Sequence, residues 1–101
     1  MKELIEKVKT LTSTDAINDF IYGAFETGDA AYITKSIGAV IRARGISAFS
    51  RETGISRMQI YRSFSENGKP NFKNLLTVIQ TLELSLTVRP KNKPAANQPP
   101  S

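Results

Sequence analysis

The stretch that decides the fold is SAFSRETGISRMQIYRSFS, residues 47–65. Ser47 can cap a short helix, and Gly54 must end it, because glycine readily adopts the left-handed conformation that closes helices. Ser56 and Gln59 follow at the spacing of a capping box, so a second helix starts almost at once. Two helices joined by so few residues, with a glycine at the turn, cannot lie antiparallel. They must cross steeply, which predicts a helix-turn-helix.

The side chains of this stretch divide into an inward and an outward face. Ser50 is small where the two helices approach each other most closely. The residues expected to point inward are Phe49, Thr53, Ile55, Ile60 and Phe64. The residues left facing outward on the second helix are Arg57, Met58, Tyr61 and Arg62.

Apolar residues also recur at helical spacing on both sides of this stretch. Upstream, Thr12 and Asp15 resemble a second capping box, and Asp29 can cap the helix that leads to Gly45. Downstream, Asn71 can cap a last helix. The sequence is therefore expected to be mainly helical.

The period changes from 3.6 to 2 near the end of the last helix, where Leu82, Leu84, Leu86 and Val88 alternate with polar residues. This pattern predicts a half-buried strand. A single strand has no partner in a helical chain, so we expect it to pair with a second copy or with the sheet edge of another protein. The alternative is a frayed helix end. Four of the five prolines lie in residues 90–101, and this composition is typical of a disordered tail.

Composition excludes several functions for this chain of 101 residues. It contains no cysteine and no histidine, so disulfides, thiolate or imidazole metal sites, cysteine nucleophiles and histidine bases are ruled out. No carboxylate pair or glycine-rich phosphate loop emerges, and we expect neither an enzyme nor a cofactor. No apolar run is long enough to cross a membrane, and the start lacks the apolar core of a secretion signal. A cytoplasmic protein with no membrane partner is the expectation.

Charge is distributed unevenly. Residues 1–31 carry three cations and six anions, a net charge of −3. Residues 32–69 carry seven cations and two anions, a net charge of +5, and five of those cations are arginines. Residues 70–101 add a further +3. The asymmetry suggests two partners of opposite sign, and the alternative is an ordinary solvated surface.

Two blocks, Ala43-Arg44-Gly45 just before the predicted helix-turn-helix and Arg51-Glu52-Thr53-Gly54 within it, carry a resemblance to known proteins. The helix-turn-helix of residues 47–65 is called the corner below. The helix-turn-helix resembles phage-repressor-like DNA-binding domains of the XRE/Cro type. More narrowly, residues 15–88 resemble addiction-module antidote proteins, which are related to HigA antitoxins. The resemblance implies a protein that represses its own operon and neutralises a RelE/HigB-like toxin.

Periodicity and resemblance together predict an all-α fold: a lambda-repressor-like helix-turn-helix domain of about five helices with a short C-terminal β-strand. The expected parts are an N-terminal helical segment (1–28), the DNA-binding domain (29–83), the pairing strand (84–89) and the tail (90–101).

If the second helix of the corner enters a major groove, its first residues meet base edges. Arg57 is then suited to a bidentate contact with guanine, and Arg62 to a base or a phosphate. Tyr61 can bond a phosphate or pack on a thymine methyl group, and Met58 can do only the latter. Each cation has an alternative role as solvated surface.

Other polar residues are weaker candidates for DNA contact. Ser56 and Gln59 are expected to act in capping rather than base reading, and the helix start at Ser47 could hold a phosphate. The remaining candidates for phosphate contact are Lys69, Arg44 and Asn67.

The expected partners are double-stranded operator DNA, a RelE/HigB-like toxin and a second copy of the chain, because one such domain covers only one half-site. RNA-cleaving toxins of this type are generally basic, so the acidic segment 1–28 could attract one. The alternative is that residues 17–25 simply pack on the domain. Two rival functions stay open: a phage-repressor-like regulator without a toxin partner, and a protein-interaction module whose basic face is incidental.

Overall fold

The computed structural model describes residues 1–91, which form six α-helices and contain no β-strand. The helices are α1 (Lys2–Lys9), α2 (Thr14–Glu26), α3 (Ala30–Arg44), α4 (Ile46–Thr53), α5 (Arg57–Ser63) and α6 (Phe72–Thr81). The predicted all-α class is confirmed, with six helices in place of about five.

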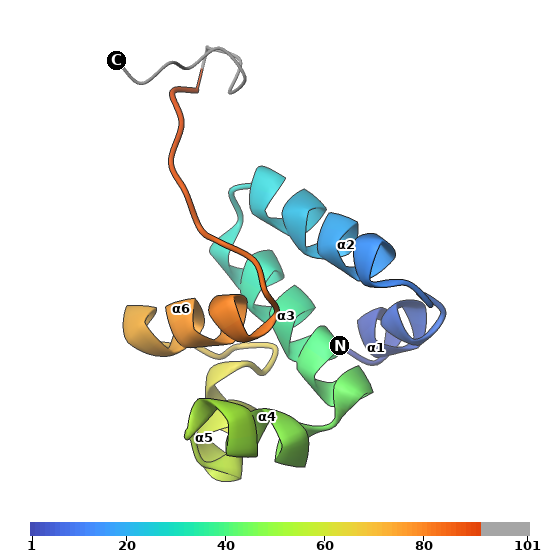
Figure 1. The fold of residues 1–101 in the computed structure, drawn as a ribbon, viewed down its shortest axis with the longest axis vertical. Coiled ribbons are helices and arrows are strands. Elements are labelled where there is room, and N and C mark those ends of the chain that lie inside the picture. Colours follow the sequence, from blue (N-terminus) through green and yellow to red (C-terminus); the bar gives the residue numbers. More distant parts are fainter. Residues whose placement is uncertain (92–101) are drawn as a thin grey trace.

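Helix α3 is the centre of the fold, with α1 and α2 on one side and α4 to α6 on the other (Figure 1). It contacts α1, α2 and α4, while α4 also contacts α5 and α6. Residues 36–41 of α3 are all buried, because this helix is surrounded by its neighbours. The buried core is built from Val8, Ile21, Ile37, Ala39, Val40, Ile41, Phe49, Ile55, Ile60, Phe64, Val78, Ile79 and Leu82.

The N-terminal helices belong to this same core. Val8 of α1 and Ile21 of α2 are both buried and pack into the cluster around α3. Residues 17–25 therefore pack on the rest of the chain, as the alternative to a toxin-attracting segment predicted. Removing residues 1–28 would expose one side of α3 to water.

Side-chain caps start most of the helices. The predicted caps are confirmed at Asp29, whose carboxylate accepts from the Tyr32 N–H, and at Asn71, whose amide oxygen accepts from the Asn74 N–H. The predicted cap at Thr12 is wrong, because the hydroxyl of Ser13 accepts from the Ala16 N–H instead. Thr12 and Ser13 are both good capping residues, so composition alone does not separate the two registers.

The predicted strand over 84–89 is wrong. Glu83 has a positive φ of 63°, and the Leu84 N–H donates to the Ile79 carbonyl at 3.1 Å, so α6 closes with a tight turn. Beyond it the chain runs extended past α2 (Figure 1), tied there by an ion pair of 3.1 Å between Arg89 and Glu26. The segment with alternating Leu84, Leu86 and Val88 has no strand to pair with within residues 1–91. Of these three side chains, only that of Leu84 packs against the core. Most of the predicted tail, residues 92–101, lies outside the described residues.

No helix within residues 1–91 is long and apolar enough to span a membrane.

Candidate nucleic-acid interface

The corner begins where α3 ends. Gly45 closes α3 by donating its N–H to the Ile41 carbonyl at 2.8 Å, and it is also the residue before the first turn of α4. Its φ of 109° is a conformation that side chains with a Cβ rarely adopt. One glycine therefore serves as the end of one helix and the start of the next.

The turn between α4 and α5 is fixed by short side chains. Gly54 has a φ of 77° and donates its N–H to the Ser50 carbonyl at 2.9 Å, as predicted for the end of α4. The Ser50 hydroxyl donates to the Ile55 carbonyl at 2.7 Å, and the Thr53 hydroxyl donates to the Phe49 carbonyl at 2.6 Å. Thr53 also accepts from the Ile55 N–H at 3.1 Å. The polar groups of the turn are thus satisfied within the turn, which holds the corner in one shape.

Two serines near the corner have different roles. Ser56 caps α5, because its hydroxyl accepts from the Gln59 N–H at 3.1 Å, and the predicted start of α5 is confirmed. The predicted cap at Ser47 is wrong: α4 already starts at Ile46, so Ser47 lies in its first turn. Its hydroxyl instead accepts from the Arg57 guanidinium at 3.3 Å, which links the start of α5 to the start of α4.

The predicted division into inward and outward faces is confirmed. Ile60 and Phe64 are fully buried, and Phe49 and Ile55 are nearly so. The outward-facing residues of α5 and its cap are exposed: Ser56, Arg57, Met58, Gln59, Tyr61 and Arg62. Met58 and Tyr61 keep 64% and 55% of their surface exposed, so a large apolar side chain and an aromatic ring stand in water on the outer face of α5.

Arg42 is the residue of this region that the sequence pattern missed. Its guanidinium reaches from α3 to the end of α5, where it donates to the carbonyls of Phe64 at 2.8 Å and Tyr61 at 3.4 Å. It also lies over the Tyr61 ring, 5.1 Å from the ring centre. Burial lowers the pKa of Arg42, although an arginine stays charged at neutral pH. Because a cation stabilises the negative end of a helix dipole, Arg42 holds both the end of α5 and the Tyr61 ring in place.

Gly38 makes this contact possible. A Cβ at this position would overlap the Phe64 carbonyl oxygen and crowd the Arg42 guanidinium. Close packing therefore explains this helix-internal glycine. Gly68 has the same role in the loop after α5, where a Cβ would overlap the Ser63 carbonyl.

The loop from α5 to α6 is tied down by Glu66. Its carboxylate lies 3.3 Å from the amino group of Met1 and 3.7 Å from the Lys35 ammonium. The hydrogen bond and the charge of the Met1 amino group, with a smaller effect of Lys35, lower the pKa of Glu66. Lys69 and Asn67 of the same loop are exposed.

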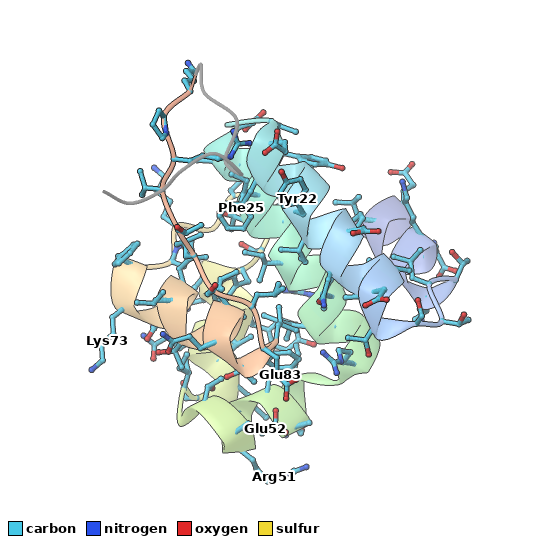
Figure 2. All side chains as sticks on the ribbon, turned by 45° about the horizontal axis from the view of Figure 1, so that its top comes forward. Tyr22, Phe25, Arg51, Glu52, Lys73 and Glu83 are labelled. Carbon is cyan, nitrogen blue, oxygen red and sulfur yellow. The ribbon has the colours of Figure 1, made fainter. Side chains whose placement is uncertain are left out.

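The cations around α5 are free for a partner. Within residues 1–91, none of Arg51, Arg57, Arg62 and Lys69 forms an ion pair. Figure 2 shows Arg51 extending from α4 into solvent and Lys73 extending from α6. Arg44 is exposed too, but it lies over the Phe49 ring at 6.0 Å, on the side of α4 that faces α2 and α6. The structure thus brings Arg57, Arg62, Tyr61 and Met58 together on one helix and places Arg44 apart from them.

The geometry defines a small helical protein in which α5 packs on α4 through a fixed turn and exposes two arginines that form no ion pair within residues 1–91. Such a helix can contact phosphates and base edges, and no cluster of metal-ligating side chains occurs within residues 1–91.

Comparison with known proteins narrows this class. The profile of a family described as probable addiction module antidote protein matches residues 2–90, and the chain belongs to that family. A curated protein from Haemophilus influenzae, described only as an uncharacterized protein, is 30% identical over 79 residues, covering 78% of this chain and 81% of its own length. No solved structure matches the chain significantly. An antidote of an addiction module has, in general, a toxin as its partner.

Proposed function

We propose that this protein is the antitoxin of a toxin–antitoxin pair that binds its own operator DNA through α4 and α5 and represses its operon. The α4–turn–α5 unit acts as a helix-turn-helix of the phage-repressor type, related to HigA antitoxins. Two copies bind one operator, because each corner covers one half-site. The protein neutralises a basic RelE/HigB-like toxin and has no catalytic role of its own.

The observation that supports DNA binding best is the outer face of α5. Arg57 and Arg62 are exposed, carry no ion pair, and flank the exposed Tyr61. An arginine fork fits the O6 and N7 atoms of guanine, and a tyrosine hydroxyl can donate to a phosphate. Arg42 holds the end of the helix, so the face is pre-shaped before DNA arrives. Ser47 supports Arg57, while Ser56 and Gln59 contribute through the cap of α5.

Anisotropy of labelled DNA from the region upstream of the gene tests this proposal against a scrambled duplex of equal length. We expect selective binding whose affinity falls steeply with salt concentration, because phosphate contacts release counterions. Arg62→Ala should reduce the salt slope or the selectivity, whereas Lys73→Ala on α6 serves as the matched control. Equal affinity for both duplexes, or no salt dependence, would argue for the protein-interaction module instead.

The toxin partner is tested in cells. If the adjacent gene encodes a small basic protein that stops growth when expressed alone, co-expression of this chain should restore growth. A regulator without a toxin partner would restore nothing. Point variants suit this test better than deletion of residues 1–28, because the deletion removes Val8 and Ile21 from the core.

A further inference from the structure

The outer face of α2 is a single stripe of exposed residues. Asp15, Asp19, Tyr22 and Glu26 follow one another at spacings of four, three and four, so they share one side of the helix, and all four are exposed. Tyr22 keeps 62% of its surface exposed. α2 contains these three carboxylates and no lysine or arginine. The stripe is therefore acidic, with one large aromatic ring in it.

Gly23, next to Tyr22, is a glycine that the fold does not require. Its backbone is helical rather than left-handed, and a Cβ built on it would meet nothing within 4 Å. Close helix packing therefore does not explain this glycine. A glycine inside a helix destabilises it relative to alanine, and here neither conformation nor packing compensates for that loss. What the missing side chain provides is open space on the surface.

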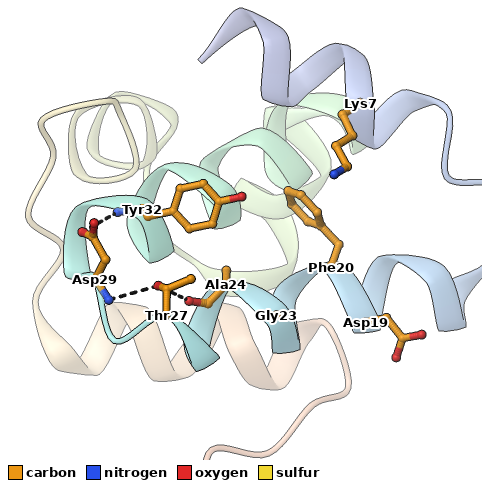
Figure 3. Close-up of a pocket in the computed structure, with 8 residues that line it drawn as sticks. All are labelled: Lys7, Asp19, Phe20, Gly23, Ala24, Thr27, Asp29 and Tyr32. Carbon is orange, nitrogen blue, oxygen red and sulfur yellow. Dashed lines mark hydrogen bonds between the residues drawn. The ribbon is translucent and has the colours of Figure 1, made fainter.

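That open space is part of a pocket. A depression of about 420 Å³, open to solvent, lies between α1, α2 and the start of α3, bordered by Gly23, Phe20, Tyr32 and Lys7. Figure 3 shows the Phe20 and Tyr32 rings directed toward each other, with the Lys7 ammonium above Phe20 at 5.8 Å from the ring centre. Asp19 stands at the edge of the pocket, so the stripe and the pocket are continuous.

The extended segment after α6 flanks the other side of the stripe. Arg89 pairs with Glu26 at 3.1 Å and holds the segment against the end of α2, where Figure 2 shows Tyr22 and Phe25. Val88, next to Arg89, is 95% exposed. A large aliphatic side chain thus stands in water next in sequence to the arginine that pairs with α2.

We propose that this surface is the docking site for the toxin, a cationic protein. The surface, here called the α2 surface, consists of Asp15, Asp19, Tyr22, Gly23 and Val88 with the adjoining pocket. An apolar side chain of the partner fills the pocket beside Gly23, and its lysines or arginines pair with Asp15 and Asp19. The proposal rests on the proposed function and names the part of the chain that binds the toxin.

Other occupants fit the α2 surface less well. A second copy related by a two-fold axis would set α2 against α2, so that Asp15 and Asp19, which form no ion pair within residues 1–91, would face the same two carboxylates of the other copy. The last ten residues, 92–101, contain no aromatic or branched aliphatic side chain that could cover Tyr22 and Val88. DNA is disfavoured because the stripe has the same sign of charge as its phosphates.

The α2 surface and the α5 face lie on different elements. α2 packs on α3, whereas α5 packs on α4, and Figure 1 shows α2 and α5 at opposite ends of the molecule. DNA and toxin can therefore be bound at the same time.

The test measures binding of the full-length chain to the purified product of the adjacent gene by calorimetry. Tyr22→Ser and Gly23→Gln are each expected to weaken binding at least tenfold, the size of effect typical of a central interface residue. Gly23→Gln should also raise the midpoint of thermal unfolding, because it replaces a helix-internal glycine, so weaker binding cannot be due to misfolding. Phe72→Ser, at the 65% exposed Phe72 that begins α6, is the matched control and should bind as the unmodified chain does.

The outcomes separate the two proposals. If the unmodified chain binds and both variants bind equally well, the α2 surface is not the docking site, and the proposed function stands. If Phe72→Ser weakens binding as much as Tyr22→Ser, the assignment to α2 also fails. If the unmodified chain does not bind the gene product at all, the toxin partner and the docking site fall together. If Tyr22→Ser converts a dimer to a monomer, the occupant is a second copy and the proposal is overturned.

Discussion

The two ends of this molecule expose a helix in different ways. At the basic end, α5 is seven residues long and is held by the Ser56 cap, by Arg42 and by the close approach of Phe64 to Gly38. At the acidic end, α2 is thirteen residues long, rests on α3, and has an open pocket beside Gly23. One helix-internal glycine, Gly38 of α3, meets the end of α5, another, Gly23, lies in α2, and the surroundings of the two glycines are opposite.

This difference suggests what each end is suited for. A surface that reads DNA must hold its side chains in one geometry, since a base contact depends on the direction of the hydrogen bond. A surface that takes up a protein side chain gains from an unfilled depression. In the proposed function, the clamped Gly38 serves the first requirement and the open Gly23 serves the second.

The largest effect is expected from Gly38→Ala. The added methyl group would overlap the Phe64 carbonyl and displace Arg42, which should lower the free energy of unfolding by about 3 kcal/mol. Urea denaturation followed by circular dichroism measures it. A change smaller than that of an ordinary surface substitution would contradict the close contact between α3 and the end of α5.

Arg57→Ala should come next and should act on binding alone. If Arg57 contacts a guanine as proposed, its loss should cost about 2 kcal/mol of discrimination between operator and scrambled DNA. Because Arg57 is exposed and its bond to Ser47 is long at 3.3 Å, the melting temperature should change little. Unaltered operator affinity would remove Arg57 from the DNA-binding face.

Arg42→Met tests whether the clamp matters for the basic end. It keeps much of the side-chain volume but removes the bonds to the Phe64 and Tyr61 carbonyls, which should lower stability by about 1.5 kcal/mol. Operator affinity should fall with it, while binding at the α2 end stays unchanged. Arg42→Lys should recover little, because lysine lacks the planar fork that reaches two carbonyls.

Gly23→Ala is the counterpart of Gly38→Ala and should have the opposite sign. With open space around the new methyl group, the gain in helix propensity should stabilise the fold by about 1 kcal/mol. The same denaturation experiment compares the two glycines directly. A loss of stability would mean that Gly23 has a structural role.

The smallest effect concerns Glu66 and pH. The pKa of Glu66 is lower in the folded chain than its ordinary value of 4.5, so folding favours the ionised form. The contribution of Glu66 to the free energy of unfolding is complete above pH 4.5 and disappears as the pH falls through the lowered pKa. Glu66→Gln should therefore be slightly less stable at pH 7 and should converge with the unmodified chain in acid. A difference that grows on acidification would contradict the assigned partners.

Local rules predicted most of the corner. The glycine that ends α4, the Ser56 cap and the inward residues Ile60 and Phe64 follow from the residue types at fixed spacings, and the structure has them as predicted. These features depend on neighbours within a turn or two. The choice between Thr12 and Ser13 failed because two adjacent residues can both serve as caps.

Features that join distant parts of the chain could not be predicted. Arg42 contacts Phe64, twenty-two residues away, and nothing in the helical period of α3 marks it as different from Arg44. The alternation after Leu82 was taken for a strand, but a strand needs a partner, and the turn at Glu83 leads the segment toward α2 instead. Gly23 and Gly38 look alike in sequence, and only the neighbours in space separate them.

The double use of Gly45 leaves the chain without slack between α3 and α4. Adding one helical residue to the end of α3, before Gly45, would turn everything downstream by about 100° around the axis of α3, since an α-helix has 3.6 residues per turn. Such an insertion would carry the Phe64 carbonyl out of reach of Arg42. The orientation of the basic helix is therefore set by chain length at a single residue, so an insertion at this joint should be far more damaging than one in the loop at Thr12.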